Sequence, residues 1–175
     1  MVMGKMTAKI IRDALATKHS SDIFVPECKT GQTWFNDKLR KLDAWVLRRS
    51  WVHFGTIGYE IKISRSDFLR DKKWPEYLDY CHEFYFVCPW GMIQKNDIPD
   101  NRVGLCWITK NGSRVIIKRH ADYREIGVPK LLLYYVLMSR VVVIRDYEYY
   151  QIVSERDRLK KHIGDIRTAV RKASA

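Results

Sequence analysis

The sequence lacks the residue spacings that mark common metal and nucleotide sites. Its four cysteines include no Cys-x-x-Cys pair, and its five histidines include no His-x3-His spacing. Structural zinc sites normally use such spacings, so none is predicted. The sequence also has no Gly-rich phosphate loop, and it therefore gives no sign of a nucleotide cofactor.

Long apolar runs are also absent. Residues 131–138 and 141–144 are strongly apolar, but Ser139 and Arg140 divide them, and neither piece approaches the length of a membrane span. Residues 1–9 lack the apolar core of a signal peptide. Because the cysteines are also separated, we expect a reduced, cytoplasmic protein with no membrane partner.

Positive charge is abundant. The 175 residues include 32 Lys and Arg against 20 Asp and Glu, which gives a formal net charge of +12. This excess suits a polyanionic partner, of which nucleic acid is the commonest, although a solvated basic surface would give the same numbers. With 46% hydrophobic and 13% aromatic residues, the chain is not a disordered basic tail.

The hydrophobic periodicity predicts an α/β sandwich around a mixed sheet. A helix over 129–144 that is apolar nearly all round is expected to be buried. The other expected elements are helices over 5–18 and 65–73, and strands over 23–25, 41–47, 58–63, 82–88, 103–109 and 113–118.

Local signals set several boundaries. Ser64 and Asp67 have the spacing of a capping box, and Pro75 must stand near the start of a new helical piece. Asn111-Gly112 predicts a hairpin turn, and residues 49–58, which contain two glycines, are interpreted as another. We expect the first strand to close at Pro26.

The last segment is charged and has a heptad-like pattern. Its apolar residues are Tyr149, Ile152, Leu159, Ile163, Ile166 and Val170, with Arg156 interrupting the series. Such a helix either packs on its own domain or closes a homodimer. We therefore divide the chain into a domain over 1–145 and a C-terminal helix over 146–175.

Two neighbouring strands carry the candidate site. Asp43 lies in the strand 41–47, on the face of Trp45 and opposite Leu42, and the next strand carries Glu60-x-Lys62. Alternation puts Glu60 and Lys62 on one face. Two carboxylates can hold a divalent cation, and an ammonium can steady a nucleophile or a phosphate oxygen. The alternative is a pair of exposed carboxylates bound to neighbouring Lys or Arg.

A second Glu-x-Lys begins at Glu27, but it follows Pro26 and leads into a turn-like stretch. The segment after Lys62 interleaves positive charge with aromatic rings, which suits phosphate neutralisation and base stacking. A solvated basic helix with its aromatic residues in the core is the alternative, and it is the preferred interpretation of Trp74. The candidate DNA-binding residues are Arg65, Arg70, Lys72, Lys73 and Tyr77.

The stretch from 23 to 90 resembles the MmcB-like group of DNA-repair proteins, which belongs to the PD-(D/E)XK nuclease superfamily. The resemblance rests on residues 60–68 (EIKISRSDF), 71–77 (DKKWPEY) and 84–87 (FYFV). It implies a restriction-endonuclease-like αβββαβ core with a mixed central sheet flanked by helices, followed here by C-terminal helices. One departure is Leu42, which stands where the motif name has proline.

The resemblance also implies roles for single residues. Asp43 and Glu60 would bind Mg²⁺ or Mn²⁺, the carbonyl of Ile61 and the carboxylate of Glu27 would add ligands, and Lys62 would orient the attacking water. The expected function is metal-dependent DNA cleavage in repair or processing. The alternative is a nuclease-like module that grips DNA or a repair partner without cutting it.

Overall fold

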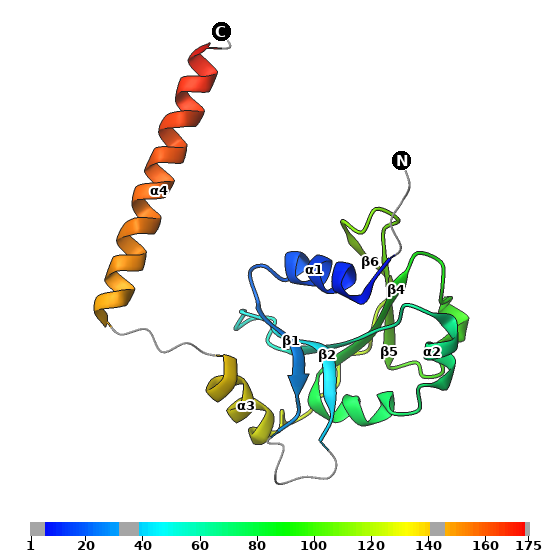
Figure 1. Cartoon of the computed structure of the whole chain (residues 1–175). Coiled ribbons are helices and arrows are strands. Elements are labelled where there is room, and N and C mark those ends of the chain that lie inside the picture. Colours follow the sequence, from blue (N-terminus) through cyan, green and yellow to red (C-terminus); the bar gives the residue numbers. More distant parts are fainter. Residues whose placement is uncertain (1–5, 32–38, 141–145, 174–175) are drawn as a thin grey trace. The chain divides into compact units, whose positions relative to one another are not determined.

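The computed structural model describes residues 6–31, 39–140 and 146–173. The chain divides into two compact units, Met1–Arg140 and Val141–Ala175. The first is a sheet with its helices, and the second contains one long helix, α4 (Asp146–Ala173) (Figure 1). The boundary predicted after residue 145 adjoins residues 141–145, which lie outside the described residues.

The first unit is built on a six-stranded sheet with strands in sequence order. Strand pairs β3–β4 and β4–β5 are parallel and the other three pairs are antiparallel, so the predicted mixed sheet is confirmed. The strands are β1 (Ile23–Lys29), β2 (Lys41–Leu47), β3 (Thr56–Ile61), β4 (Glu83–Pro89), β5 (Val103–Ile108) and β6 (Val115–Arg119).

Helices cover both faces of this sheet. Phe84 and Phe86 belong to one buried cluster and Tyr85 and Val87 to another, as the alternation of a strand requires. Helix α1 (Ala8–Lys18) packs on the Tyr85 face. The other face carries α2 (Arg65–Arg70), the 3₁₀ segment η1 (Trp74–Tyr80) and α3 (Lys130–Arg140). A short 3₁₀ turn, η2 (Lys95–Asp97), precedes β5.

Several local predictions are confirmed. The Ser64 hydroxyl accepts a hydrogen bond from the Asp67 N–H at 3.2 Å and begins α2. Pro75 stands in the first turn of η1. Gly112 has a φ of 75° in the turn between β5 and β6, a left-handed conformation that favours glycine. Within the described ranges, no helix is both long and apolar enough to cross a membrane.

Several predicted boundaries are wrong, and three of these errors bear on the candidate site. Strand β1 does not close at Pro26 but continues to Lys29, because β1 is an edge strand in which a missing N–H is tolerated. Helix α2 ends at Arg70 instead of residue 73, and Asp71 leaves it in an extended conformation. Strand β3 covers 56–61 rather than 58–63, so Gly58 lies inside the strand and not in the turn.

The expected burial of the helix over 129–144 is also wrong. Leu132 and Val136 are buried, but Tyr134, Leu137 and Met138 are exposed, and Met138 has a relative exposure of 77%. Only one side of the helix therefore packs on the sheet. Its apolar composition was not a reliable indicator of burial. Its described part ends at Arg140.

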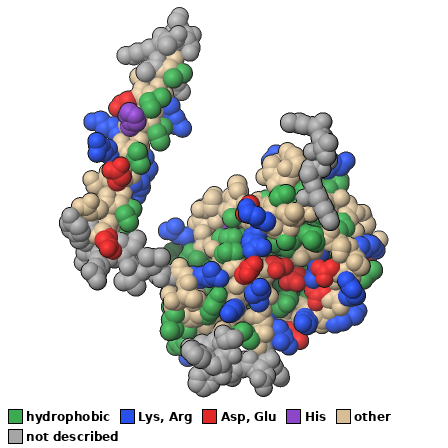
Figure 2. All heavy atoms as spheres, in the orientation of Figure 1, with side chains coloured by type: hydrophobic (Ala, Val, Ile, Leu, Met, Phe, Trp, Pro, Cys, Tyr) green, Lys and Arg blue, Asp and Glu red, His purple; other side chains and the backbone are tan. Residues whose placement is uncertain are grey.

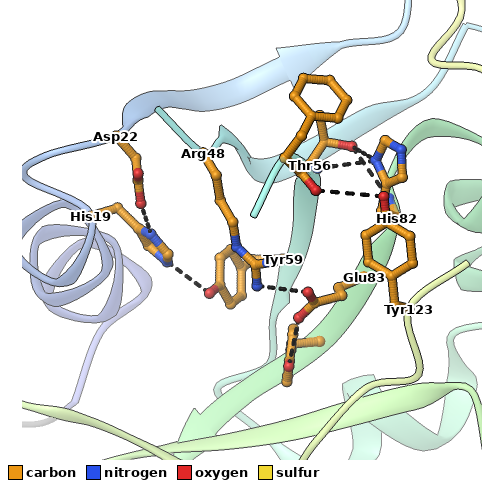
Figure 3. A network of polar contacts seen from close by, with 10 residues as sticks. His19, Asp22, Arg48, Thr56, Tyr59, His82, Glu83 and Tyr123 are labelled. Atoms are coloured by element: carbon orange, nitrogen blue, oxygen red, sulfur yellow. Dashed lines mark hydrogen bonds and ion pairs between the residues drawn. The ribbon is translucent and has the colours of Figure 1, made fainter. Parts of the chain in front are cut away.

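A buried polar network ties α1 to the strands (Figure 3). His19 contacts the hydroxyl of Tyr59 through Nε2 at 2.8 Å and Asp22 Oδ2 through Nδ1 at 2.9 Å. Arg48 forms an ion pair of 2.6 Å with Glu83 on β4. Glu83 begins β4, and Tyr59 belongs to the buried cluster on the α1 face of the sheet, so neighbouring Glu60, by the alternation of a strand, points to the other face.

Candidate active site

Asp43 and Glu60 are brought together by the β2–β3 hairpin. Ala44 pairs with Tyr59, so the next residues along the two antiparallel strands, Asp43 and Glu60, are neighbours at one end of the sheet. Asp43 Oδ2 accepts a hydrogen bond of 2.8 Å from the N–H of Ile61. That bond fixes one carboxylate at the point where β3 ends.

The two carboxylates influence each other electrostatically. Burial, followed by the nearby charge of Asp43, raises the pKa of Glu60 to about 8. Burial also raises the pKa of Asp43, although the hydrogen bond from Ile61 opposes the change. Because the two acids are half-buried and close together, the ionisation of one disfavours the ionisation of the other. Pairs of this kind occur in sites that bind a cation.

Lys62 stands beside this pair. Its side chain is only 4% exposed, and Nζ lies 3.0 Å from Glu60 Oε1. Burial lowers the pKa of Lys62, but hydrogen bonds and charges from Asp71 and Glu60 outweigh it, so the net pKa is raised. The ammonium is therefore charged at neutral pH.

Asp71 is a residue of this site to which the sequence analysis gave no role. Its Oδ2 lies 2.7 Å from Lys62 Nζ, and Asp67 Oδ2 lies 3.7 Å from the same nitrogen. The Asp71 carboxylate is buried, whereas that of Asp67 is exposed. The cap at Ser64 and the break at Pro75 limit α2 to a short helix. These two residues were the sequence signal that the end of α2 lies close to Lys62.

Tyr77 lies on the buried side of these charges. Burial, followed by the charges of Glu60 and Asp71, raises its pKa. Its ring lies 5.9 Å from that of Phe84, centroid to centroid, within the core. The predicted base-stacking role requires an exposed ring, which Tyr77 does not have. Trp74 packs against the same core, as preferred from the sequence.

Glu27 is held by two cations. Its carboxylate accepts from Arg12 Nη1 at 2.8 Å and from Lys41 Nζ at 3.3 Å, and these bonds lower its pKa. Among residues 6–31, 39–140 and 146–173, no group of three or more His, Cys, Asp and Glu side chains is arranged to hold a metal ion. The structure thus does not gather Glu27 with Asp43 and Glu60 into such a group.

The backbone is irregular where Glu27 passes beside Asp43. The residues on either side of Glu27 pair with those on either side of Asp43, and Glu27 itself has a φ of 49°. Leu42 packs in the same cluster as Trp45, although simple alternation predicts opposite faces. The pairing register is the same on both sides of Glu27, so the irregularity is its left-handed backbone and not an inserted residue.

The predicted DNA-binding cations differ in their availability. Arg65 is committed to Asp97 through two hydrogen bonds of 2.7 Å. Arg70 donates through Nε to its own helix, at the carbonyl of Ser66, while Lys72 and Lys73 are exposed. A cleft of about 340 Å³ adjoins the site, lined by Phe68, Leu69, Asp71, Lys72, Trp74, Pro75, Asp97 and Pro99.

Figure 2 shows acidic side chains gathered on one part of the first unit, with basic side chains around them. Asp43, Glu60, Lys62 and Asp71 thus form a half-buried group of three carboxyl groups and one ammonium at the end of β3 and the end of α2.

Comparison with known proteins identifies a related fold but no family. No family model matches the sequence, and no curated protein matches it. A solved structure described as the SPO1766 protein of unknown function from Silicibacter pomeroyi is similar over 92% of each chain, with a TM-score of 0.54 and 16% sequence identity. At this identity the similarity shows a shared α/β fold alone.

Proposed function

We propose that this chain is a metal-dependent DNA nuclease, similar to the MmcB-like PD-(D/E)XK proteins, that hydrolyses phosphodiester bonds in DNA repair or processing. The observation that carries the proposal is the pairing of Asp43 and Glu60 on adjacent strands, with Lys62 Nζ 3.0 Å from Glu60 Oε1. The four free, buried cysteines suit action in the cytoplasm.

The residues present fit a divalent cation. Asp43 and Glu60 are two carboxyl groups on adjacent strands, and burial, followed by the charge of Asp43, raises the pKa of Glu60 to about 8. Mg²⁺ and Mn²⁺ prefer oxygen ligands, and Mg²⁺ commonly keeps several waters, so two carboxylates are a sufficient protein contribution. Asp43 and Glu60 would hold the ion, with the Ile61 carbonyl as a further ligand. A bound ion supplies Lewis acidity and lowers the pKa of a bound water.

Lys62 and two exposed lysines would contact the substrate, and Asp71 would position Lys62. Lys62 remains charged, so its ammonium can hold the attacking water and balance the negative charge that develops on the phosphate. Asp71 orients Lys62 from the side away from β3. The exposed Lys72 and Lys73 would contact the phosphate backbone on either side of the scissile bond.

A cleavage assay tests the proposal. Labelled single-stranded, duplex and flapped DNA would be incubated with Mg²⁺, Mn²⁺ or EDTA, using the wild type, Glu60→Gln and the exposed control Glu125→Gln. We expect metal-dependent products from the wild type and the control, and at least a hundredfold loss in Glu60→Gln. Undiminished cleavage by Glu60→Gln would overturn the assignment.

A second candidate is a nuclease-like module that binds DNA without cutting it. This candidate is suited by the ion pairs that hold Lys62, at 2.7 Å to Asp71 and 3.0 Å to Glu60. An ion-pair network that only stabilised the fold would have the same contacts. This candidate predicts salt-sensitive DNA binding and no products in Mn²⁺. It also predicts that Lys62→Ala binds DNA as tightly as the wild type.

A further inference from the structure

Helix α4 carries a regular apolar stripe. Tyr149, Ile152, Leu159, Ile163, Ile166 and Val170 follow one another at steps of three and four residues, with Arg156 completing the series. Such alternating steps average 3.5 residues, the repeat of a left-handed coiled coil. In heptad notation, Tyr149, Arg156, Ile163 and Val170 occupy position a, and the others occupy position d.

Within the second unit the stripe is exposed. Its apolar side chains are between 49% and 58% exposed, and the rest of the helix is strongly charged. A helix with one narrow apolar stripe depends on packing that stripe, since isolated helices are marginally stable in water. This exposure therefore calls for an occupant.

We propose that the stripe packs on the stripe of a second copy, so that α4 forms a parallel two-stranded coiled coil and the chain is a homodimer. A two-fold axis makes the surface its own partner, and each seam side chain then enters the hole opposite it. This inference rests on α4 alone and is independent of the proposed nuclease activity.

One pair of charges beside the stripe favours a parallel orientation. Glu155 is at position g and Lys160 at position e of the next heptad, and both line the apolar groove formed by Ile152, Leu159 and Ile163. In a parallel pair, position g of one helix meets position e of the other, so Glu155 faces Lys160 of the second copy. An antiparallel pair joins g to g and e to e, and it loses this match.

Arg156 is compatible with the seam. Its guanidinium already pairs with Asp157 of its own helix at 2.8 Å, on the outer side of the stripe. In a parallel dimer, Glu155 of the second copy also flanks this position, and the Arg156 methylenes can cover the neighbouring apolar side chains. A charged residue at a single seam position weakens the dimer but fixes its register.

Light scattering of the full chain tests the dimer. We expect twice the 20.8 kDa mass of one chain, with the mass falling to one chain in Ile163→Asp. The control Ser154→Asp adds the same charge on the outer face and should remain dimeric. A single-chain mass for the wild type, as would follow if α4 packed on its own domain, or an unchanged mass for Ile163→Asp would overturn the proposal.

A cysteine variant tests the orientation. The four native cysteines are buried, so a disulfide formed by Ile166→Cys in a glutathione redox buffer is attributable to the new thiol when the wild type forms none. Parallel seams bring both copies of position 166 together, and covalent dimers are expected, whereas an antiparallel pair places them at opposite ends of the seam. A dimeric Ile166→Cys protein that yields no covalent dimer would overturn the parallel arrangement.

Discussion

The ammonium nitrogen of Lys62 lies 2.7 Å from Asp71 Oδ2, closer than its 3.0 Å distance to Glu60 Oε1. Asp71 comes from the end of α2, and Glu60 comes from β3. Lys62 is thus held between the sheet and the helix that follows it. In the proposed nuclease, Asp71 is a positioning residue that sets where the Lys62 charge meets the substrate.

Replacing Asp71 with Asn should reduce DNA cleavage while leaving the fold intact. Asn keeps the shape but removes the charge that holds Lys62 Nζ, and loss of such a supporting contact typically costs about 10–100-fold in activity. We expect the loss in kcat, with little change in KM, because Asp71 acts through Lys62. The matched control is Asp79→Asn, which alters an exposed residue of η1. Equal kcat in the two variants would contradict this role.

Replacing Glu60 with Gln should stabilise the metal-free protein. Glu60 has a pKa of about 8, against 4.5 for an unperturbed group, so at pH 8.5 it must ionise beside Asp43. Gln removes that charge and can still accept from Lys62, which should increase the free energy of unfolding by about 1–3 kcal/mol. The measurement is thermal unfolding in EDTA at pH 8.5.

The same variant gives a metal-binding measurement that does not depend on activity. A ligand that binds only the folded state raises the midpoint of unfolding. Mg²⁺ should therefore raise the midpoint of the wild type and of Glu125→Gln, but not that of Glu60→Gln. An equal Mg²⁺ effect on all three would place any bound cation elsewhere.

Local sequence patterns were sufficient to predict much of the secondary structure. The alternation in residues 41–47 gave β2 its bounds, the Ser64 hydroxyl gave α2 its start, and Asn111-Gly112 gave the hairpin. These features depend on neighbours a few residues away. That Asp43 and Glu60 lie on neighbouring strands could be predicted too, because residues 49–58 were interpreted as a hairpin turn between those strands.

Contacts between distant segments could not be predicted in this way. Glu27 has the spacing of a ligand, but its carboxylate is bound by Arg12 from α1, which no local pattern reveals. Tyr77 follows a basic helix, yet the 3₁₀ geometry of η1 turns its ring into the core. Asp71 was expected inside a helix over 65–73, but it follows the last residue of α2 and pairs with Lys62.

Stability should fall as the solution becomes acidic, partly through His82. Thr56 N–H donates to His82 Nδ1 at 3.0 Å, and burial lowers the pKa of His82 below 6.5. Below pH 6.5 the unfolded chain therefore binds a proton that the folded chain resists, and the free energy of unfolding decreases by at most about 1.4 kcal/mol per pH unit for this group. Above that pH the full stability is present.

Denaturant titrations at pH 5, 6, 7 and 8 would measure this dependence in the wild type and in His82→Asn, whose Oδ1 can replace Nδ1 as acceptor. We expect the variant to be less stable at pH 8 but to lose less between pH 7 and 5. His19, whose pKa burial also lowers, keeps part of the slope in both proteins. Identical slopes would show that His82 does not contribute.

Replacing Gly104 with Ala should destabilise the sheet for a purely steric reason. A Cβ at Gly104 would come within 2.3 Å of the Tyr85 ring and 2.8 Å of the Ala121 backbone nitrogen. The Tyr85 ring cannot easily give way, because it is buried and its hydroxyl donates to Glu83 Oε2 at 2.9 Å. Alanine suits a strand at least as well as glycine, so any loss reports the clash alone. We expect a decrease of about 1–3 kcal/mol in the free energy of unfolding by urea.

Gly127→Ala, where no atom lies within 4 Å of the new Cβ, is the control and should change stability little. Equal stability of the two variants would mean that β4 and β5 lie further apart than the structure places them.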